Sequence, residues 1–165
     1  MKVKAFIGIG SNLGDRLEHC RAALGRLGHL PDTIVVGISP FSETEPEEGV
    51  EGGLFLNAVA EIITSLSPRE LLQHLQGIET ALGRPPGHCG GMARTMDLDI
   101  LLYGDAVIHE PDLTIPHPRM ARRRFVLAPL AALAPTLRHP VLKATAIELL
   151  RRLGPEPVGF VGQRQ

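Results

Sequence analysis

The chain has 165 residues, of which 44% are hydrophobic and 21% are charged, and its formal net charge at pH 7 is −1. This composition is typical of a globular protein, and the near-neutral charge argues against a protein that coats nucleic acid or a membrane surface. No apolar run approaches the roughly 20 residues that span a bilayer and no secretory signal is present, so we expect a cytoplasmic protein without a nucleic-acid or membrane partner.

The first predicted strand covers residues 2–9, because Val3, Ala5 and Ile7 alternate with other residues along it. It leads into a glycine-rich stretch at residues 8–16, and a helix is predicted over 15–27. The glycine spacing is one residue off the dinucleotide fingerprint, and no acidic residue ends a second strand further on. A tight strand-to-helix turn is the better interpretation, and a P-loop is excluded because no Gly-Lys-Ser/Thr follows.

A second strand is predicted over residues 33–38, followed by a polar stretch at 39–53 with several prolines, glycines and glutamates. Such a stretch indicates either a functional or mobile loop or simply a solvated acidic one. The next strand, over 54–64, is apolar apart from Asn57. A buried amide needs hydrogen-bond partners, which are either a neighbouring strand or the edge of a ligand.

The segment Ser67–Glu70 has the pattern of a capping box with proline at the first helical position, which predicts a helix over 68–82. Gln76 and Glu79 share one flank of this helix, beside its apolar stripe. The ordinary interpretation of such a pair is helix surface. A glycine- and proline-rich segment at 83–93 then either folds over a ligand or is a plain connector.

The strand predicted over 96–103 places Asp97 and Asp99 side by side on one face, with Met96, Leu98 and Ile100 facing a core. Two neighbouring carboxylates repel each other unless positive charge lies between them. Mg²⁺ typically takes one or two carboxylates together with substrate phosphates, so this pair indicates a metal site. The alternative is a solvated strand face with an exposed ion pair.

Further on, His117 lies between two prolines and precedes the three arginines at 122–124, which indicates either an anion site or a solvated helix start. Helices are predicted over 126–133 and 145–153. The resulting order β-α-β-β-α-β predicts an α+β fold of the ferredoxin-like type, with an antiparallel sheet and both early helices on one face. The C-terminal helices would cover the other face as a third layer. We expect a single domain over residues 1–165, with a core at about 2–153 and a loose tail at 154–165.

Several motifs occur together in one order. They are GSNLGDR at 10–16, FLNAV at 55–59, Q-x-x-E at 76–79, GR at 83–84, RTMDLDILLYGD at 94–105, LTIPHPRM at 113–120 and RxFVLxPL at 123–130. Over about residues 2–135 the chain closely resembles the 6-hydroxymethyl-7,8-dihydropterin pyrophosphokinase family. The resemblance implies a monomeric enzyme of folate biosynthesis that transfers pyrophosphate from ATP to the hydroxymethyl group of the pterin and releases AMP.

The resemblance also implies roles for particular residues. Asp97 and Asp99 match the ligands of two Mg²⁺ ions, and Asp99 is the favoured acceptor of the hydroxyl proton. The matched catalytic residues are Arg84, Arg94, Asp97 and Asp99. The matched ATP-binding residues are Gln76, Glu79, Arg84, Arg94, Ile100, Thr114, His117 and Arg123. The matched pterin-binding residues are Thr44, Phe55, Asn57 and Phe125, of which the two phenylalanines are expected to sandwich the flat ring.

The chain departs from the family pattern in the glycine-rich segment. Pro86 stands where relatives commonly have a second arginine, and Gly91-Met92-Ala93 replaces Trp-Gly-Pro. We therefore keep as an alternative a catalytically impaired relative that acts as a binding protein. A single-stranded nucleic-acid module of similar architecture is disfavoured by the negative net charge.

Overall fold

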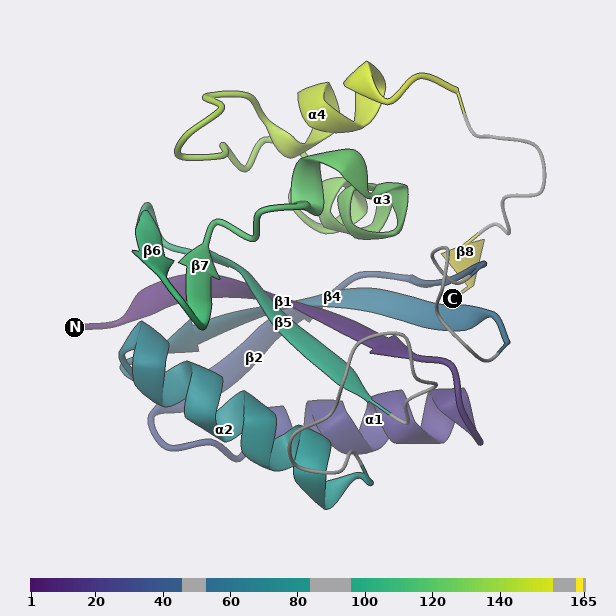
Figure 1. Cartoon of the computed structure of the whole chain (residues 1–165), viewed down its shortest axis with the longest axis vertical. Helices are drawn as coiled ribbons and strands as arrows, with labels where there is room; N and C mark the ends of the chain where they lie inside the picture. The colour runs from purple at the N-terminus through teal and green to yellow at the C-terminus, as the bar shows by residue number, and fades with distance from the viewer. Residues whose placement is uncertain (46–52, 84–95, 156–162, 165) are drawn as a thin grey trace.

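The computed structural model of the chain describes residues 1–45, 53–83, 96–155 and 163–164. Within these residues, an antiparallel sheet lies between two layers of helices (Figure 1). The helices α1 (Arg16–Leu27) and α2 (Pro68–Ala81) cover one face of the sheet. On the other face lie α3 (Arg124–Leu133) and α4 (Ala146–Arg152). The predicted three-layer, ferredoxin-like α+β fold is thus confirmed.

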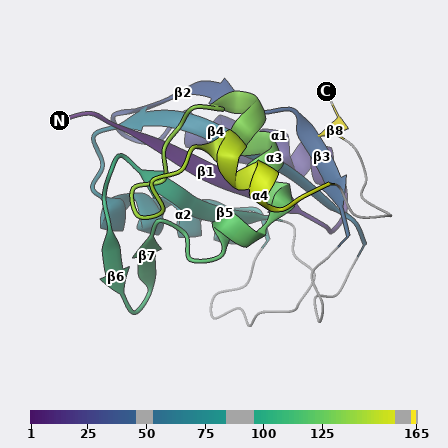
Figure 2. The ribbon, with the colours of Figure 1, turned by 90° about the horizontal axis from the view of Figure 1, so that it is seen from above.

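The sheet is built around β1 (Val3–Ser11), which pairs antiparallel with β4 (Phe55–Thr64) on one side and with β5 (Asp97–Tyr103) on the other. Because β4 is long, it pairs with two further strands along its free edge. One is β2 (Thr33–Ile38), which pairs with the second half of β4, and the other is β3 (Phe41–Thr44), which pairs with its first residues. Figure 2 shows the same layers from above.

Two helix starts follow from local sequence. The side chain of Ser67 accepts a hydrogen bond from the backbone N–H of Glu70, and the carboxylate of Glu70 accepts one from the N–H of Ser67. This is the predicted capping box. Asp15 caps α1 in a simpler way, since its carboxylate accepts a hydrogen bond from the backbone of Glu18. Caps of this kind stabilise a helix by about 0.5–2 kcal/mol each.

The strand patterns explain where the two hydrophobic cores lie. Ala5 and Ile7 of β1 point into a core shared with α1 and α2, whereas Phe6 points into a second core under α3 and α4. In β5, Leu98 and Ile100 enter the first core. The predicted alternation is therefore confirmed along β1 and the first residues of β5, where Asp97 and Asp99 take the other face, whereas Leu101 and Leu102 further along β5 enter the second core.

Three predicted connections are different in the structure. The polar stretch at 39–53 contains the strand β3, so the loop interpretation is wrong for residues 41–44. A hairpin that the predicted order of elements does not contain forms from β6 (Ile108–Glu110) and β7 (Leu113–Ile115). Finally, β8 (Gln163–Arg164), within the expected C-terminal tail, pairs with β3. Short edge strands depend on partners far away in sequence, which local patterns do not reveal.

Among the described residues, no helix combines the length and apolar character needed to cross a bilayer.

Candidate active site

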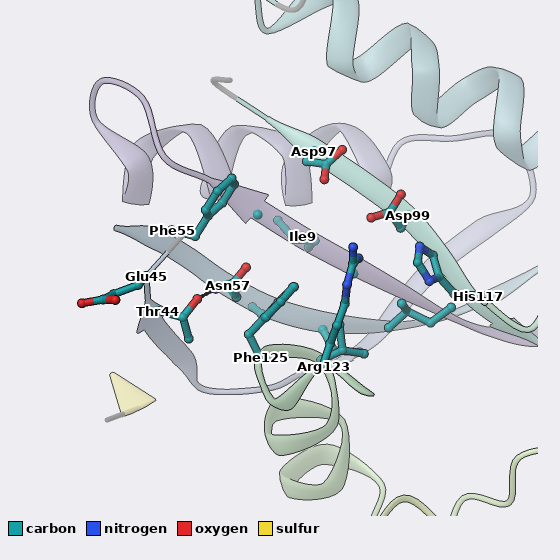
Figure 3. Close-up of a pocket in the computed structure, with 16 residues that line it drawn as sticks. Ile9, Thr44, Glu45, Phe55, Asn57, Asp97, Asp99, His117, Arg123 and Phe125 are labelled. Carbon is teal, nitrogen blue, oxygen red and sulfur yellow. Dashed lines mark hydrogen bonds between the residues drawn. The ribbon is translucent and has the colours of Figure 1, made fainter. Parts of the chain in front are cut away.

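A pocket opens on the face of the sheet that carries α3, where β1, β4 and β5 lie beside the start of that helix (Figure 3). Rows of paired residues form its base. Asp97 of β5 pairs with Gly10 of β1, which pairs in turn with Asn57 of β4, and Asp99 pairs with Gly8 in the next row. Both acids therefore lie on the same face as Asn57.

Asp97 and Asp99 are partly exposed, whereas Leu98 between them is buried on the opposite face. The prediction of one face carrying both acids is thus confirmed. Among the described residues there is no group of three or more His, Cys, Asp or Glu side chains that could hold a metal ion, either at this pair or elsewhere. A hard divalent cation at this pair gains two carboxylates from the described residues and completes its shell with water or phosphate oxygens, an arrangement that suits Mg²⁺.

Gly8 and Gly10 keep the base of the pocket open. Both lie inside β1, which continues to Ser11, so the predicted tight turn begins later than expected. A Cβ atom on Gly10 would lie 3.2 Å from Oδ1 of Asn57 and 3.5 Å from the ring of Phe55. The two glycines therefore provide space between the acids and Asn57.

Phe55, Asn57 and Phe125 form the apolar end of the pocket. Phe55 begins β4, Phe125 lies in the first turn of α3, and Figure 3 shows Asn57 between them. The amide nitrogen of Asn57 donates a hydrogen bond of 2.8 Å to the hydroxyl of Thr44. Asn57 is only 4% exposed, and this bond uses one of the two N–H groups of its amide, while Figure 3 shows the amide oxygen pointing away from Thr44. A flat, polar-edged ring is the ligand that such an arrangement suits.

Cationic and imidazole groups form the remaining wall. Arg123 directly precedes α3, and its guanidinium lies 5.4 Å from the centre of the Phe125 ring. His117 is held beside β5 because its backbone N–H donates to the carbonyl of Leu101 at 3.0 Å. Its Nδ1 accepts a hydrogen bond from the backbone of Arg119 at 3.2 Å, which places the proton of the neutral ring on Nε2.

The pKa of His117 is lowered from 6.5 to about 4, mainly by burial and to a lesser extent by the positive charges of Arg123 and Arg119. Asp97 opposes this effect without overcoming it. The ring is therefore a neutral hydrogen-bond donor at pH 7, and the positive charge of this wall comes from Arg123.

The shifted pKa of His117 predicts a pH-dependent stability. Because the unfolded chain binds the proton near pH 6.5 and the folded chain only near pH 4, stability present above pH 6.5 is lost as the pH falls towards 4. The shift corresponds to a loss of about 3 kcal/mol at most. In His117→Asn, whose side-chain oxygen keeps the acceptor, urea unfolding should show a smaller loss over this range. Parallel profiles for the two proteins would contradict the assignment.

Four of the predicted residues that the structure describes do not line the pocket. Glu79 is buried, and its carboxylate accepts a hydrogen bond of 2.8 Å from the backbone of Leu98, so it fastens α2 to β5. The helix-surface interpretation is thus wrong for Glu79, whereas Gln76 is exposed. Ile100 belongs to the core, and Thr114 lies on β7. Arg84 and Arg94, like Pro86 and Gly91–Ala93, lie outside the described residues.

Sequence reasoning missed several contributors to the pocket. Glu45 lies at its rim, directly after β3. Gly8 and Gly10 were assigned to a turn, although Ile9 continues the period-two pattern of buried residues and signals that the strand goes on. Of the three arginines at 122–124, only Arg123 lines the pocket. Arg124 instead donates to the carbonyl of Gly154, near the end of the C-terminal helix.

Comparison with known proteins identifies relatives of the chain. The sequence model of the 7,8-dihydro-6-hydroxymethylpterin-pyrophosphokinase family matches residues 6–135. The 2-amino-4-hydroxy-6-hydroxymethyldihydropteridine pyrophosphokinase of Pseudomonas aeruginosa is 42% identical over 137 residues, which cover 83% of this chain and 84% of the relative. The Bacillus subtilis protein of the same name is 46% identical over 127 residues, or 77% of this chain and 75% of the relative.

Some relatives are much longer. The folic acid synthesis protein fol1 of Schizosaccharomyces pombe is 42% identical over 90% of this chain, but the chain spans only 20% of that protein. A crystal structure of Plasmodium falciparum HPPK-DHPS with pteroate superimposes with a TM-score of 0.73 at 16% identity, over 92% of this chain and 42% of that one. At this identity the superposition supports the fold, and the sequence relatives support the family.

Proposed function

The chain belongs to the 7,8-dihydro-6-hydroxymethylpterin-pyrophosphokinase family, and from this premise we propose that it transfers pyrophosphate from ATP to 6-hydroxymethyl-7,8-dihydropterin in folate biosynthesis. The hydroxymethyl oxygen attacks the β-phosphorus of ATP and loses its proton, and the bond from the β-phosphorus to the α-phosphate oxygen breaks. AMP leaves with that oxygen. The observation that carries the proposal is one pocket in which two acids lie across a glycine base from an amide and two phenyl rings.

The acidic half of the pocket is assigned to the triphosphate. Asp97 and Asp99 hold two Mg²⁺ ions, which when bound neutralise the charge that develops on the phosphate oxygens. Arg123 adds a fixed positive charge, and neutral His117 donates its Nε2–H to a phosphate oxygen. Positioning and charge neutralisation do most of the work in such transfers. Arg84 and Arg94 are proposed to contact the triphosphate as well.

Further nucleotide contacts are proposed for Gln76, Glu79, Ile100 and Thr114. The side chains of Glu79 and Ile100 are buried, so these residues are proposed to support β5 and to contact the nucleotide through backbone atoms. Asp99 is the proposed acceptor of the hydroxyl proton, because it carries a carboxylate on the pocket face of β5.

The apolar half is assigned to the pterin. Phe55 and Phe125 stack against its two faces, and Asn57 reads the donor and acceptor groups along its edge. Thr44 fixes the amide of Asn57 through the 2.8 Å hydrogen bond. A monomer is proposed as the working unit. A cytoplasmic location is proposed because the reaction needs a supply of ATP.

The decisive experiment mixes the purified chain with ATP, Mg²⁺ and 6-hydroxymethyl-7,8-dihydropterin and follows AMP and pterin diphosphate by chromatography. We expect equal amounts of both products. ADP in place of AMP would indicate single phosphoryl transfer. Binding of both substrates without AMP would favour a catalytically impaired relative that acts as a binding protein, and would overturn the proposed activity.

Replacing Gly10 by alanine should weaken pterin binding. The new methyl group would lie 3.2 Å from Oδ1 of Asn57, so the amide must shift by a few tenths of an ångström, and it would reach ordinary contact with the Phe55 ring at 3.5 Å. We expect the KM for the pterin to rise about tenfold, with a smaller change in the KM for ATP. Gly77→Ala on α2 is the matched control, because a Cβ there meets nothing within 4 Å. Equal effects of the two substitutions on the pterin KM would contradict the assignment.

A further inference from the structure

Arg16 occupies an electrostatically unfavourable position. It is the first residue of α1, directly after the capping Asp15, and a cation at a helix N-terminus faces the positive end of the helix dipole. An arginine at this position needs compensation from partners outside the helix. Its guanidinium has two such partners, both from segments that lead into the pocket.

Both partners of Arg16 lie next to residues of the pterin half of the pocket. One nitrogen, Nη1, donates to the carbonyl oxygen of Leu54 at 2.8 Å. The other, Nη2, lies 3.4 Å from the carboxylate of Glu43. Leu54 directly precedes Phe55, and Glu43 directly precedes Thr44. One side chain therefore holds β3 and β4 at the points where each strand delivers a residue to the pocket.

Because side chains alternate along β3, the contact between Arg16 and Glu43 lies on the face of the sheet opposite the pocket. Glu43 pairs with Leu56 and points to the α1 side of the sheet, where Leu56 is part of the core. Thr44 follows Glu43 and points to the opposite side, where it accepts the hydrogen bond from Asn57. The position of β3 against β4 thus sets the Thr44–Asn57 bond.

The burial of the pair favours a fixed contact. The carboxylate side chain of Glu43 is only 5% exposed, and the side chain of Arg16 is 30% exposed. Removing a cation that lies beside a buried carboxylate is costly, so loss of Arg16 would favour a rearrangement of β3 that exposes Glu43 to water. Thr44 would move with it.

We infer that Arg16 is a positioning residue for the pterin half of the active site: by bridging Glu43 and the Leu54 carbonyl it fixes Thr44, Asn57 and Phe55 in the geometry that receives the ring. This inference rests on the proposed function. It assigns to Arg16 no contact with either substrate, and it predicts that pterin affinity depends on Arg16 while ATP affinity does not.

The test compares Arg16→Gln with Arg16→Lys and with Arg21→Gln, which replaces an exposed arginine on the same helix. Pterin affinity is measured by titration calorimetry in the presence of a non-hydrolysable ATP analogue, and affinity for the analogue alone is measured separately. We expect Arg16→Gln to weaken pterin binding about tenfold and analogue binding less than twofold. Lysine should restore part of the loss because an ammonium reaches only one partner, and Arg21→Gln should match the wild type.

The outcomes separate the inference from the proposed function. If the wild-type chain binds no pterin and releases no AMP, the proposed function fails. If it is active and Arg16→Gln keeps full pterin affinity, or loses affinity for both ligands alike, the inference is overturned. If Arg16→Gln does not fold, Glu43→Gln takes its place, since Arg16 then keeps its bond to Leu54. If Glu43→Gln weakens pterin binding less than tenfold but leaves analogue binding unchanged, the inference is supported. If it causes no loss that is specific to the pterin, the inference is overturned.

Discussion

Asp97→Asn and Asp99→Asn are each expected to reduce AMP formation by at least about a thousandfold, because metal-held charge stabilisation contributes several kcal/mol to reactions of this kind. Asparagine keeps the size of the side chain but loses the negative charge that attracts Mg²⁺. Both acids are partly exposed at the pocket, so the substitutions leave the buried side of β5 unchanged. The measurement is the rate of AMP release at saturating ATP and pterin over a range of Mg²⁺ concentrations.

A matched control and a second readout make this prediction specific. Asp105→Asn removes an exposed acid just beyond β5 and should keep wild-type activity. Thermal unfolding offers a readout without turnover, because a ligand that binds only the folded chain raises the melting temperature. Addition of Mg²⁺ with a non-hydrolysable ATP analogue should stabilise the wild type more than either variant. Activity within tenfold of the wild type in both variants would contradict the metal assignment.

Asn57→Ala is expected to weaken pterin binding about a hundredfold while ATP binding is retained, because sites that hydrogen-bond a ligand discriminate strongly once a partner is missing. The substitution removes the amide that is proposed to face the ring edge and leaves the Thr44 hydroxyl without its 2.8 Å donor. Pterin and ATP-analogue affinities can be measured by calorimetry at one temperature, below the melting point of the variant.

Loss of a buried polar group also destabilises the fold, so a control must reproduce that effect at a distance. Thr64→Val serves this purpose, since Thr64 lies at the far end of the same strand, is fully buried and shares a 2.7 Å hydrogen bond with Thr33. It should lower the melting temperature without changing pterin affinity. If Thr64→Val and Asn57→Ala weakened pterin binding equally, Asn57 would have only a structural role.

Local patterns predicted the parts of the site that depend on one strand at a time. Alternation along β5 placed both acids on one face, and Asn57 stood out as a lone amide in an apolar strand. A capping box fixed the start of α2. These features depend on neighbours two to four residues apart, and such spacings are readable in a sequence.

Features that depend on distant residues were not predictable in the same way. The strand β3 forms because β4 is long enough to offer it an edge, although the residues of β3 are largely polar. Glu79 is buried because β5 offers it a backbone N–H, 19 residues away. Gly8 and Gly10 resemble turn residues until the side chains they would meet are known. Each case needs the tertiary structure to decide between two locally equal interpretations.

The central position of β4 restricts how this chain can change in length. Its ten residues serve three neighbouring strands, and its two faces separate the core from the ligand. Insertion of one residue before Asn57 would turn its amide towards the hydrophobic core and would place Leu56 or Ala58 on the pocket face instead. Insertions or deletions in this strand are therefore compatible with the arrangement of the pocket only in even numbers of residues.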